Sequence, residues 1–494
     1  MPGFSLKLWT VALFSFCLAE KEHGIVYPRM LESRSATGEK MLKINDDLTL
    51  TLQKSKVFTD SFLFSTTKDN EPIDYYVRAE DAERDIYHDP THMASVKVTD
   101  EDGVEVEGIL GQRLRVQPLP VAARNSEGLK AHRLYEIEAH EAEHLPHDYG
   151  TPNATRDYVE SRAGSTNFPM YEIPMAIYPE VWVVADSEFS KQFNFKKDKV
   201  ITYFAVLMNA ANLRYASLVY PKVQLRITGI TMNKRPNEEP YIVKVQGHDK
   251  YRNILFKETL SQFNTYMKKY SLYNESDIVF LVTAKNMSEW VNNQLQSWTG
   301  GYAYVGTACS QWRVGMCEDR PTSYYGAYVF SHELAHNLGC NHDGDPAGDW
   351  VTGHIGSADC PWKDGYLMSY EMKDERQYQF SYCCQREIRN LYNRPEFRCL
   401  RERKKTATIR RSSKLPGSKT SLSNYCRRVY MHEPGMKANM SYGIRGVQDC
   451  KVQCVGRNNW WRLGVVDGTP CSRDKTKACI LGECVDKMVI SKEE

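Results

Sequence analysis

The chain has 494 residues, of which 41% are hydrophobic and 26% charged, and its formal net charge is +2. This length is enough for two to four domains, and the hydrophobic fraction is ample for buried cores, so the composition indicates a globular protein and excludes a disordered one. The near-neutral charge balance gives no domain-wide basic face, and we therefore expect no nucleic-acid partner.

The N-terminus has the pattern of a secretory signal. A positive region ends at Lys7, an apolar run extends from Leu8 to Leu18, and Ala19 is a small residue that suits cleavage before Glu20. A short membrane anchor is the alternative. Because no later stretch has the roughly twenty uninterrupted apolar residues of a membrane span, we expect residues 1–19 to be a signal peptide and the product to be secreted and extracellular.

Cysteine placement agrees with export. Apart from Cys17, no cysteine precedes Cys309, and thirteen follow from there. In an oxidising compartment these would form disulfides, and an odd number leaves one thiol free or paired with another chain. Four N-x-S/T sequences are candidate glycosylation sites on exposed surface: Asn153, Asn274, Asn286 and Asn439.

Residues 20–165 predict a small β-rich domain. Alternating apolar and polar residues indicate strands at Lys43–Leu52, Ser95–Val98 and Gly103–Glu107. Near the end of this region lies a polar cluster that could reach a metal, and we expect it instead to be a solvated segment before a loop. The cluster consists of His140, His144, His147 and Asp148.

Residues 166–400 alternate between strand and helix patterns. Apolar runs and periodicity predict strands at Tyr178–Asp186, Val223–Ile227 and Asp277–Thr283 and helices at Lys199–Tyr220, Tyr251–Tyr270 and Tyr324–Leu338. Gly301–Cys309 is bounded by glycines and predicts an edge strand, to which an extended peptide could add as one more strand. The alternative is a capped edge with no ligand.

One helix carries a metal-binding pattern. His332 and His336 are four residues apart and project from one helix face, and Gly339 can take a positive φ that turns the chain so that His342 reaches the same ion. Catalytic zinc commonly has three protein ligands and a water with a pKa near 7, and Glu333 is placed to take a proton from that water. The pattern predicts metal-assisted hydrolysis. The alternatives are a buried helix with incidental histidines and a zinc protein without catalysis, and the presence of Glu333 argues against the second.

Beyond these residues, Gly365–Tyr370 forms a predicted tight turn that contains Met368. The sequence H-E-x-x-H-x-x-G-x-x-H-D followed by this turn resembles the metzincin proteases, and Asp343 resembles the reprolysin branch, which includes adamalysins, ADAM and ADAM-TS proteases. The runs Y-P-E-V-W-V-V-A-D and G-x-A-x-V-G-x-x-C also resemble that branch, with the closest overall likeness to salivary-gland metalloproteases of blood-feeding ticks. The resemblance implies an α/β (α+β) catalytic domain over 166–400, with a twisted five-stranded mixed sheet, an active-site helix, one catalytic zinc and Met368 as an apolar floor.

Two further implications of the resemblance concern a second metal and a tyrosine. Reprolysins often bind calcium, and Glu180 and Asp277 would fit, but Leu400–Glu402 after Cys399 lacks the asparagine of that site, so Ca²⁺ stays an open alternative. In astacin-like and serralysin-like metzincins a tyrosine at the offset of Tyr370 steadies the oxyanion. We expect a packing tyrosine here.

The resemblance also implies an inactive precursor. Residues 20–165 would then be a propeptide that helps folding and blocks the cleft until it is removed. A propeptide thiolate could occupy the open zinc position, but this region has no cysteine, which excludes that device. No dibasic or R-x-x-R sequence occurs near Arg156–Arg162, so the processing enzyme is open.

The C-terminal part divides into a connector and a small module. Residues 401–422 predict a linker whose basic run could contact sulfated glycans, although we prefer a solvated connector. Residues 423–494 contain six cysteines and predict a disulfide-stapled domain that resembles the cysteine-rich part of ADAM-TS proteins, which usually selects substrates.

We therefore expect a secreted zinc endopeptidase that acts on extracellular proteins. By analogy with the tick enzymes, its substrates would be matrix or clotting proteins such as fibrinogen. The alternative is a binding or antagonist protein that acts through the cysteine-rich domain, with incidental protease activity.

Overall fold

The computed structural model describes residues 21–31, 40–69, 71–119, 124–137, 148–152, 175–247, 252–297, 300–348, 350–351, 353–401, 417, 421–430, 433–457, 459–466, 468–480 and 482–486. Several predictions of the sequence lie outside this set: the signal peptide, Asn153, the cluster members His140, His144 and His147, the region Arg156–Arg162 and most of the basic linker.

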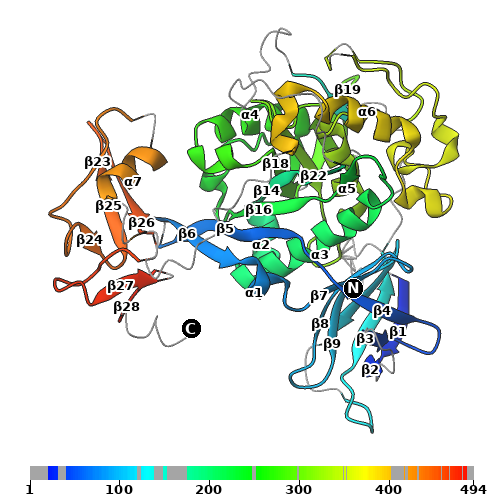
Figure 1. Ribbon diagram of the computed structural model, residues 1–494, viewed down its shortest axis with the longest axis horizontal. Helices are drawn as coiled ribbons and strands as arrows, with labels where there is room; N and C mark the ends of the chain where they lie inside the picture. Colours follow the sequence, from blue (N-terminus) through cyan, green and yellow to red (C-terminus); the bar gives the residue numbers. More distant parts are fainter. Residues whose placement is uncertain are drawn as a thin grey trace, which may run out of the picture.

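An antiparallel sheet forms the N-terminal body, drawn in blue and cyan in Figure 1. The strands predicted at Ser95–Val98 and Gly103–Glu107 correspond to β8 and β9, and their alternate residues are buried in a core with Leu42 and Leu50. In sheet order the strands are β1 (Lys21–Val26), β11 (His132–Glu136), β10 (Leu114–Pro118), β9 (Glu105–Leu110), β8 (Ala94–Thr99), β7 (Ile86–Asp89), β4 (Thr49–Lys54), β3 (Lys40–Lys43) and β2 (Arg29–Leu31).

A second, mixed sheet lies at the centre of the molecule (Figure 1). Neighbouring strands run parallel except at β21/β22 and β5/β6. In order the strands are β12 (Tyr149–Gly150), β21 (Gly301–Tyr304), β22 (Val314–Glu318), β18 (Ile278–Thr283), β14 (Glu180–Ala185), β16 (Arg226–Met232), β5 (Phe58–Lys68) and β6 (Glu71–Arg78).

The central sheet differs from the predicted five-stranded one. Its five inner strands come from residues 166–400, but β12 and the β5–β6 hairpin come from residues 20–165 and extend it at both edges. Alternation along the chain predicts that a segment is a strand, but not which sheet it joins. Thus the region expected to form a domain of its own supplies part of the central sheet.

Helices cover both faces of this sheet. In β14, Val183 packs with α3 and α5 in one core, while its neighbour Val184 packs with α4 in the other, as the two-residue period of a strand requires. The helices are α1 (Ala79–Glu83), α2 (Ser187–Gln192), α3 (Lys197–Tyr215), α4 (Phe256–Lys268), α5 (Ala327–Asn337), α6 (Tyr382–Tyr392) and α7 (Leu422–Val429). Short 3₁₀-helices are η2 (Pro236–Glu238), η4 (Ser271–Glu275), η5 (Trp362–Asp364), η6 (Leu367–Ser369), η7 (Glu375–Tyr378) and η8 (Pro395–Leu400).

Two small sheets flank the central body. They pair β13 (Ala176–Ile177) with β15 (Lys222–Val223), and β17 (Asn253–Leu255), β19 (Asn286–Val291) and β20 (Gln294–Gln296). Three disulfides also lie in this body and tie segments before and after α5 to the chain around α6 and η8: Cys309–Cys399, Cys340–Cys384 and Cys360–Cys383.

The C-terminal module, orange and red in Figure 1, lies beside the β5–β6 hairpin. Lys451 and Arg462 pair with Glu71 of β6 at 2.9 and 3.5 Å. Its strands are β23 (Lys437–Ala438), β24 (Val447–Gln448), β25 (Lys451–Val455), β26 (Trp460–Gly464), β27 (Lys477–Ile480) and β28 (Glu483–Asp486), and its disulfides are Cys426–Cys454, Cys450–Cys479 and Cys471–Cys484.

The odd thiol predicted by the cysteine count is Cys317, which is free and fully buried in β22. Among the described residues, no helix combines the length and apolarity that a membrane crossing requires.

Candidate active site

Helix α5 positions the first two histidines and ends where the sequence predicts. All of its residues, Ala327–Asn337, are buried against the central sheet. The helix stops because Gly339 has a φ of +108°, a conformation that residues with a side chain rarely adopt. The amide of Gly339 donates to the carbonyl oxygen of His336 at 2.9 Å, and the chain then reverses toward His342.

The three predicted ligands come together. The Nε2 atom of His332 lies 3.0 Å from that of His336 and 3.2 Å from that of His342. On the other side of the rings, Nδ1 of His332 donates to the carbonyl oxygen of Leu367 at 3.0 Å, and Nδ1 of His336 to that of Cys340 at 2.7 Å. A proton on Nδ1 leaves the Nε2 lone pair free, so these bonds select the form that binds a metal.

This arrangement fits a zinc ion. Nε2 lone pairs at these separations repel one another unless a cation lies between them, and three imidazole nitrogens are a common donor set for catalytic zinc. Burial lowers the pKa of His336 to about 4, which keeps its ring neutral and able to donate. His332, His336 and His342 are the residues that would hold the ion.

A fourth side chain reaches the same point, and it comes from the N-terminal region. Asp148 is fully buried, with Oδ1 2.8 Å from Nε2 of His342 and 3.6 Å from Nε2 of His336, and with Oδ2 3.3 Å from Nε2 of His332. The prediction that this part of the polar cluster is solvated is therefore wrong for Asp148. A carboxylate is buried only where charged or donor groups compensate for its lost hydration.

The two residues after Asp148 cover the adjacent sheet edge. Gly150 and Tyr149 form β12 on the outer side of β21, and the amides of Ala303 and Val305 donate to the carbonyl oxygens of Asp148 and Gly150 at 3.2 and 3.1 Å. The predicted edge strand is present, but in this state its outer side is paired rather than open.

Glu333 lies next to His332 on α5 and is fully buried. Its side chain packs against β21 so closely that a Cβ on Gly301 would lie 2.4 Å from Oε1 of Glu333. Burial, and then the negative charge of Asp148, raise the pKa of Glu333 well above its usual value. A carboxyl group with a raised pKa can both accept and return a proton near neutral pH.

Tyr370 is buried in the hydrophobic core, as predicted for a packing residue, and its ring also reaches the histidines. It follows Met368 in the turn with a φ of +54°, and its ring centroid lies 4.3 Å from that of His332. Its hydroxyl donates to Oδ2 of Asp148. In the sequence, the position of Tyr370 two residues after Met368 indicated that it could approach the metal site. Met368 itself is fully buried, and its carbonyl oxygen accepts from the amide of Asp343 at 3.1 Å.

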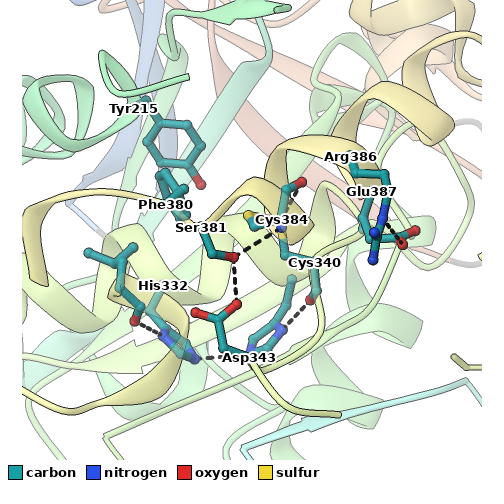
Figure 2. The surroundings of a disulfide bond; sticks show 12 residues. Tyr215, His332, Cys340, Asp343, Phe380, Ser381, Cys384, Arg386 and Glu387 are labelled. Atoms are coloured by element: carbon teal, nitrogen blue, oxygen red, sulfur yellow. Dashed lines mark hydrogen bonds and ion pairs between the residues drawn. A yellow bond between two sulfur atoms is a disulfide. The ribbon is translucent and has the colours of Figure 1, made fainter. Parts of the chain in front are cut away.

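Asp343 fixes the loop that carries His342 rather than facing the metal site. Its Oδ1 accepts a 2.5 Å hydrogen bond from the hydroxyl of Ser381, which caps α6 beside the Cys340–Cys384 disulfide (Figure 2). Burial raises the pKa of Asp343 to about 6. The hydrogen bond and the disulfide together anchor both sides of the third ligand to one helix.

The residues considered for calcium have other partners. An oxygen of Asp277 accepts from the backbone amide of Glu180 at 2.9 Å, and the cysteines grouped with Asp277, Cys309 and Cys399, are joined in a disulfide. These contacts join two strands of the sheet and give no support to a Ca²⁺ site.

Comparison with known proteins shows what the domain around this site is similar to. Residues 179–381 match the family described as Reprolysin_5, metallo-peptidase family M12, so this part of the chain is similar to reprolysin-type metallopeptidases. The venom metalloproteinase BumaMPs1 of Olivierus martensii is 27% identical over 75% of this chain and 90% of its own length. The antarease-like venom metalloproteinase TtrivMP_A of Tityus trivittatus is 25% identical over 66% of this chain and 82% of its own.

A third relative, from Bombyx mori, is described as like a disintegrin and metalloproteinase with thrombospondin motifs. It is 25% identical over 64% of this chain, which spans 45% of that protein. A solved metalloproteinase-II from Bacteroides fragilis aligns over 76% of this chain and 93% of its own with 11% identity and a TM-score of 0.35, too low to carry an argument. These relatives leave the likeness to tick enzymes a prediction.

Proposed function

We propose that the chain is the precursor of a secreted zinc endopeptidase that hydrolyses extracellular proteins, with His332, His336 and His342 as metal ligands and Glu333 as the catalytic base. The observation that carries this proposal is the convergence of three imidazole Nε2 atoms beside a buried glutamate, inside a domain that matches a metallopeptidase family. The names of the relatives from venom support an extracellular setting.

The reaction follows from the residues around the histidines. A bound zinc ion would supply Lewis acidity, which polarises a peptide carbonyl and makes a water molecule more acidic. Glu333 takes a proton from the attacking water as its oxygen bonds to the carbonyl carbon, and then delivers that proton to the amide nitrogen as the C–N bond breaks. The hydroxyl of Tyr370 lies on the same side and can donate to the carbonyl oxygen as negative charge develops there.

Other parts of the chain would hold the substrate. Once β12 is displaced, the amides of Ala303 and Val305 on β21 are free to bind an extended peptide, which aligns a scissile bond with the histidines. In this proposal residues 20–165 are a propeptide region, 166–400 the protease domain, and 423–494 a module that selects substrates, with matrix or clotting proteins as the substrate class to test.

Glu333→Ala tests the assignment. We expect the activated variant to retain one zinc per chain and to lose peptidase activity on a denatured protein substrate by roughly 10²- to 10⁴-fold, the usual contribution of a general base. Glu375→Ala, at an exposed position in η7, is the matched control and should keep full activity. Undiminished cleavage by a zinc-loaded Glu333→Ala protein would refute the proposed mechanism.

A further inference from the structure

We propose that Asp148 is a fourth ligand of the catalytic metal, and that Asp148, Tyr149 and Gly150 act as a latch that keeps the precursor inactive. This inference rests on the metal site proposed above. It assigns a definite inhibitory group to a chain whose N-terminal region has no cysteine up to the protease domain, other than Cys17.

The carboxylate of Asp148 needs a cation. It is 0% exposed, and burying an ionised carboxylate among neutral groups is strongly unfavourable. Around it lie the hydroxyl of Tyr370, which donates one hydrogen bond, and the three Nε2 atoms. The hydrogen bonds that His332 and His336 make through Nδ1 place the ring proton on Nδ1, so their Nε2 atoms have no proton to donate to the carboxylate. A zinc ion satisfies the lone pairs and the carboxylate together, because carboxylate oxygen joins imidazole nitrogen in zinc sites. Asp148 would then hold the position that catalysis requires for water.

Tyr149 holds the latch on the other side of the histidines. Its ring centroid lies 4.7 Å from that of His336 and 4.9 Å from that of His342, and its hydroxyl donates to Asp345 at 2.5 Å. These contacts fix the backbone on the C-terminal side of Asp148. The carboxylate is therefore oriented by a neighbouring residue as well as attracted by charge.

Gly150 lets the latch approach the sheet. A Cβ at this position would lie 2.2 Å from Oη and 3.1 Å from Cζ of Tyr302, and that ring packs against Phe256 with 4.9 Å between centroids. The close approach allows the amides of Ala303 and Val305 to bind the latch. Because a substrate strand would need the same amides, latch and substrate exclude each other.

The latch blocks the site without offering a bond to cut. The carbonyl oxygens of Asp148 and Gly150 accept hydrogen bonds from β21, and the strands run parallel. In this direction a carboxylate side chain, and not a peptide carbonyl, meets the histidines. We therefore expect no self-cleavage within Asp148–Gly150.

The test uses the full-length precursor loaded with Co²⁺ in place of zinc, because cobalt gives visible bands that report its ligands. Acetohydroxamic acid serves as the probe of an open metal position. We expect the wild-type spectrum to resist the probe, and Asp148→Ala to show an altered spectrum and to bind the probe at a concentration at least tenfold lower. Asp46→Ala removes a 95% exposed carboxylate and is the control that should match wild type.

Gly150→Ala gives a second, independent measurement. It keeps Asp148 but forces the latch away from Tyr302, so probe binding should again be at least tenfold tighter than in wild type. Gly150→Ala also tests the latch if Asp148→Ala does not fold. If neither variant binds the probe more tightly than wild type does, the latch proposal is wrong.

This result is separable from failure of the proposed function. If the protein binds one Co²⁺ and Glu333→Ala abolishes activity while Asp148→Ala leaves the spectrum and probe affinity unchanged, only the latch is wrong. If the wild-type precursor binds no Co²⁺, or if His342→Ala binds it equally well, the metal site itself is wrong, and the latch falls with it.

Discussion

Cleavage of the proposed precursor is expected to leave its N-terminal part attached to the proposed protease domain. The perturbation is a specific protease site inserted between Ser165 and Thr166, in a stretch outside the described residues. The attachment comes from β5, which pairs with β16 and buries Phe62 and Phe64 at 1% and 0% exposure. Each fully buried phenylalanine contributes about 1.5–3 kcal/mol, and the strand pairing and the contact of β6 with the C-terminal module add to this.

The variant Phe64→Ala measures how strongly β5 holds the N-terminal fragment. A buried phenylalanine truncated to alanine costs about 3–5 kcal/mol, which corresponds to roughly 10²- to 10⁴-fold faster dissociation of the cut fragment if the loss falls on the off-rate. The matched control is Ile25→Ala, at a 60% exposed position on β1, which should not change dissociation.

The assay is size-exclusion chromatography of the cut protein at submicromolar concentration, followed by mass spectrometry of each peak. We expect wild-type fragments to co-elute until denaturant is added, and those of Phe64→Ala to separate on dilution. Immediate separation of the wild-type fragments would refute the reasoning, as would equal retention in both variants.

Three further predictions concern buried polar groups. Cys317 is fully buried and burial raises its pKa, so a thiol reagent should label it only after unfolding; labelling of the native protein would contradict its placement. Burial raises the pKa of Asp319 to about 6, so the folded state keeps a proton that the unfolded chain loses near pH 4, and stability falls as pH rises between these values. The free energy of unfolding, measured with urea, should be roughly 2–3 kcal/mol lower at pH 7.5 than at pH 4.5. This difference should be smaller in Asp319→Asn. Ser381→Ala should lower the free energy of unfolding by about 1–3 kcal/mol, measured in the same way, because it leaves the buried Asp343 carboxylate without its hydroxyl donor.

The site around the histidines could be predicted because its residues are close in sequence. A four-residue helical spacing and a glycine that permits positive φ bring His332, His336 and His342 together with little help from the remaining chain. Strands such as β14 and β18 were likewise evident as continuous apolar runs, because both faces of the central sheet are covered.

The contacts that sequence reasoning missed are long-range and local patterns do not encode them. Asp148 belongs to a polar cluster whose composition allowed metal binding, but no local pattern shows that the folded chain brings it to the histidines. The hairpin of β5 and β6 has the alternation of any antiparallel strand pair, so its pattern did not reveal that it pairs with β16 instead of the N-terminal sheet.

These two long-range contacts lie at opposite edges of the central sheet, and they differ greatly in size. The β12 latch has two paired residues, Tyr149 and Gly150, whereas β5 adds a long strand with several buried aromatic side chains on the other edge. Displacing the latch breaks its short backbone pairing with β21 and the contacts of Asp148 and Tyr149, but expelling β5 would uncover the core behind the central sheet. In the proposed precursor, activation by cleavage should therefore release the latch locally while the β5–β6 hairpin stays in place, so that the N-terminal region would serve both as inhibitor and as a lasting part of the fold.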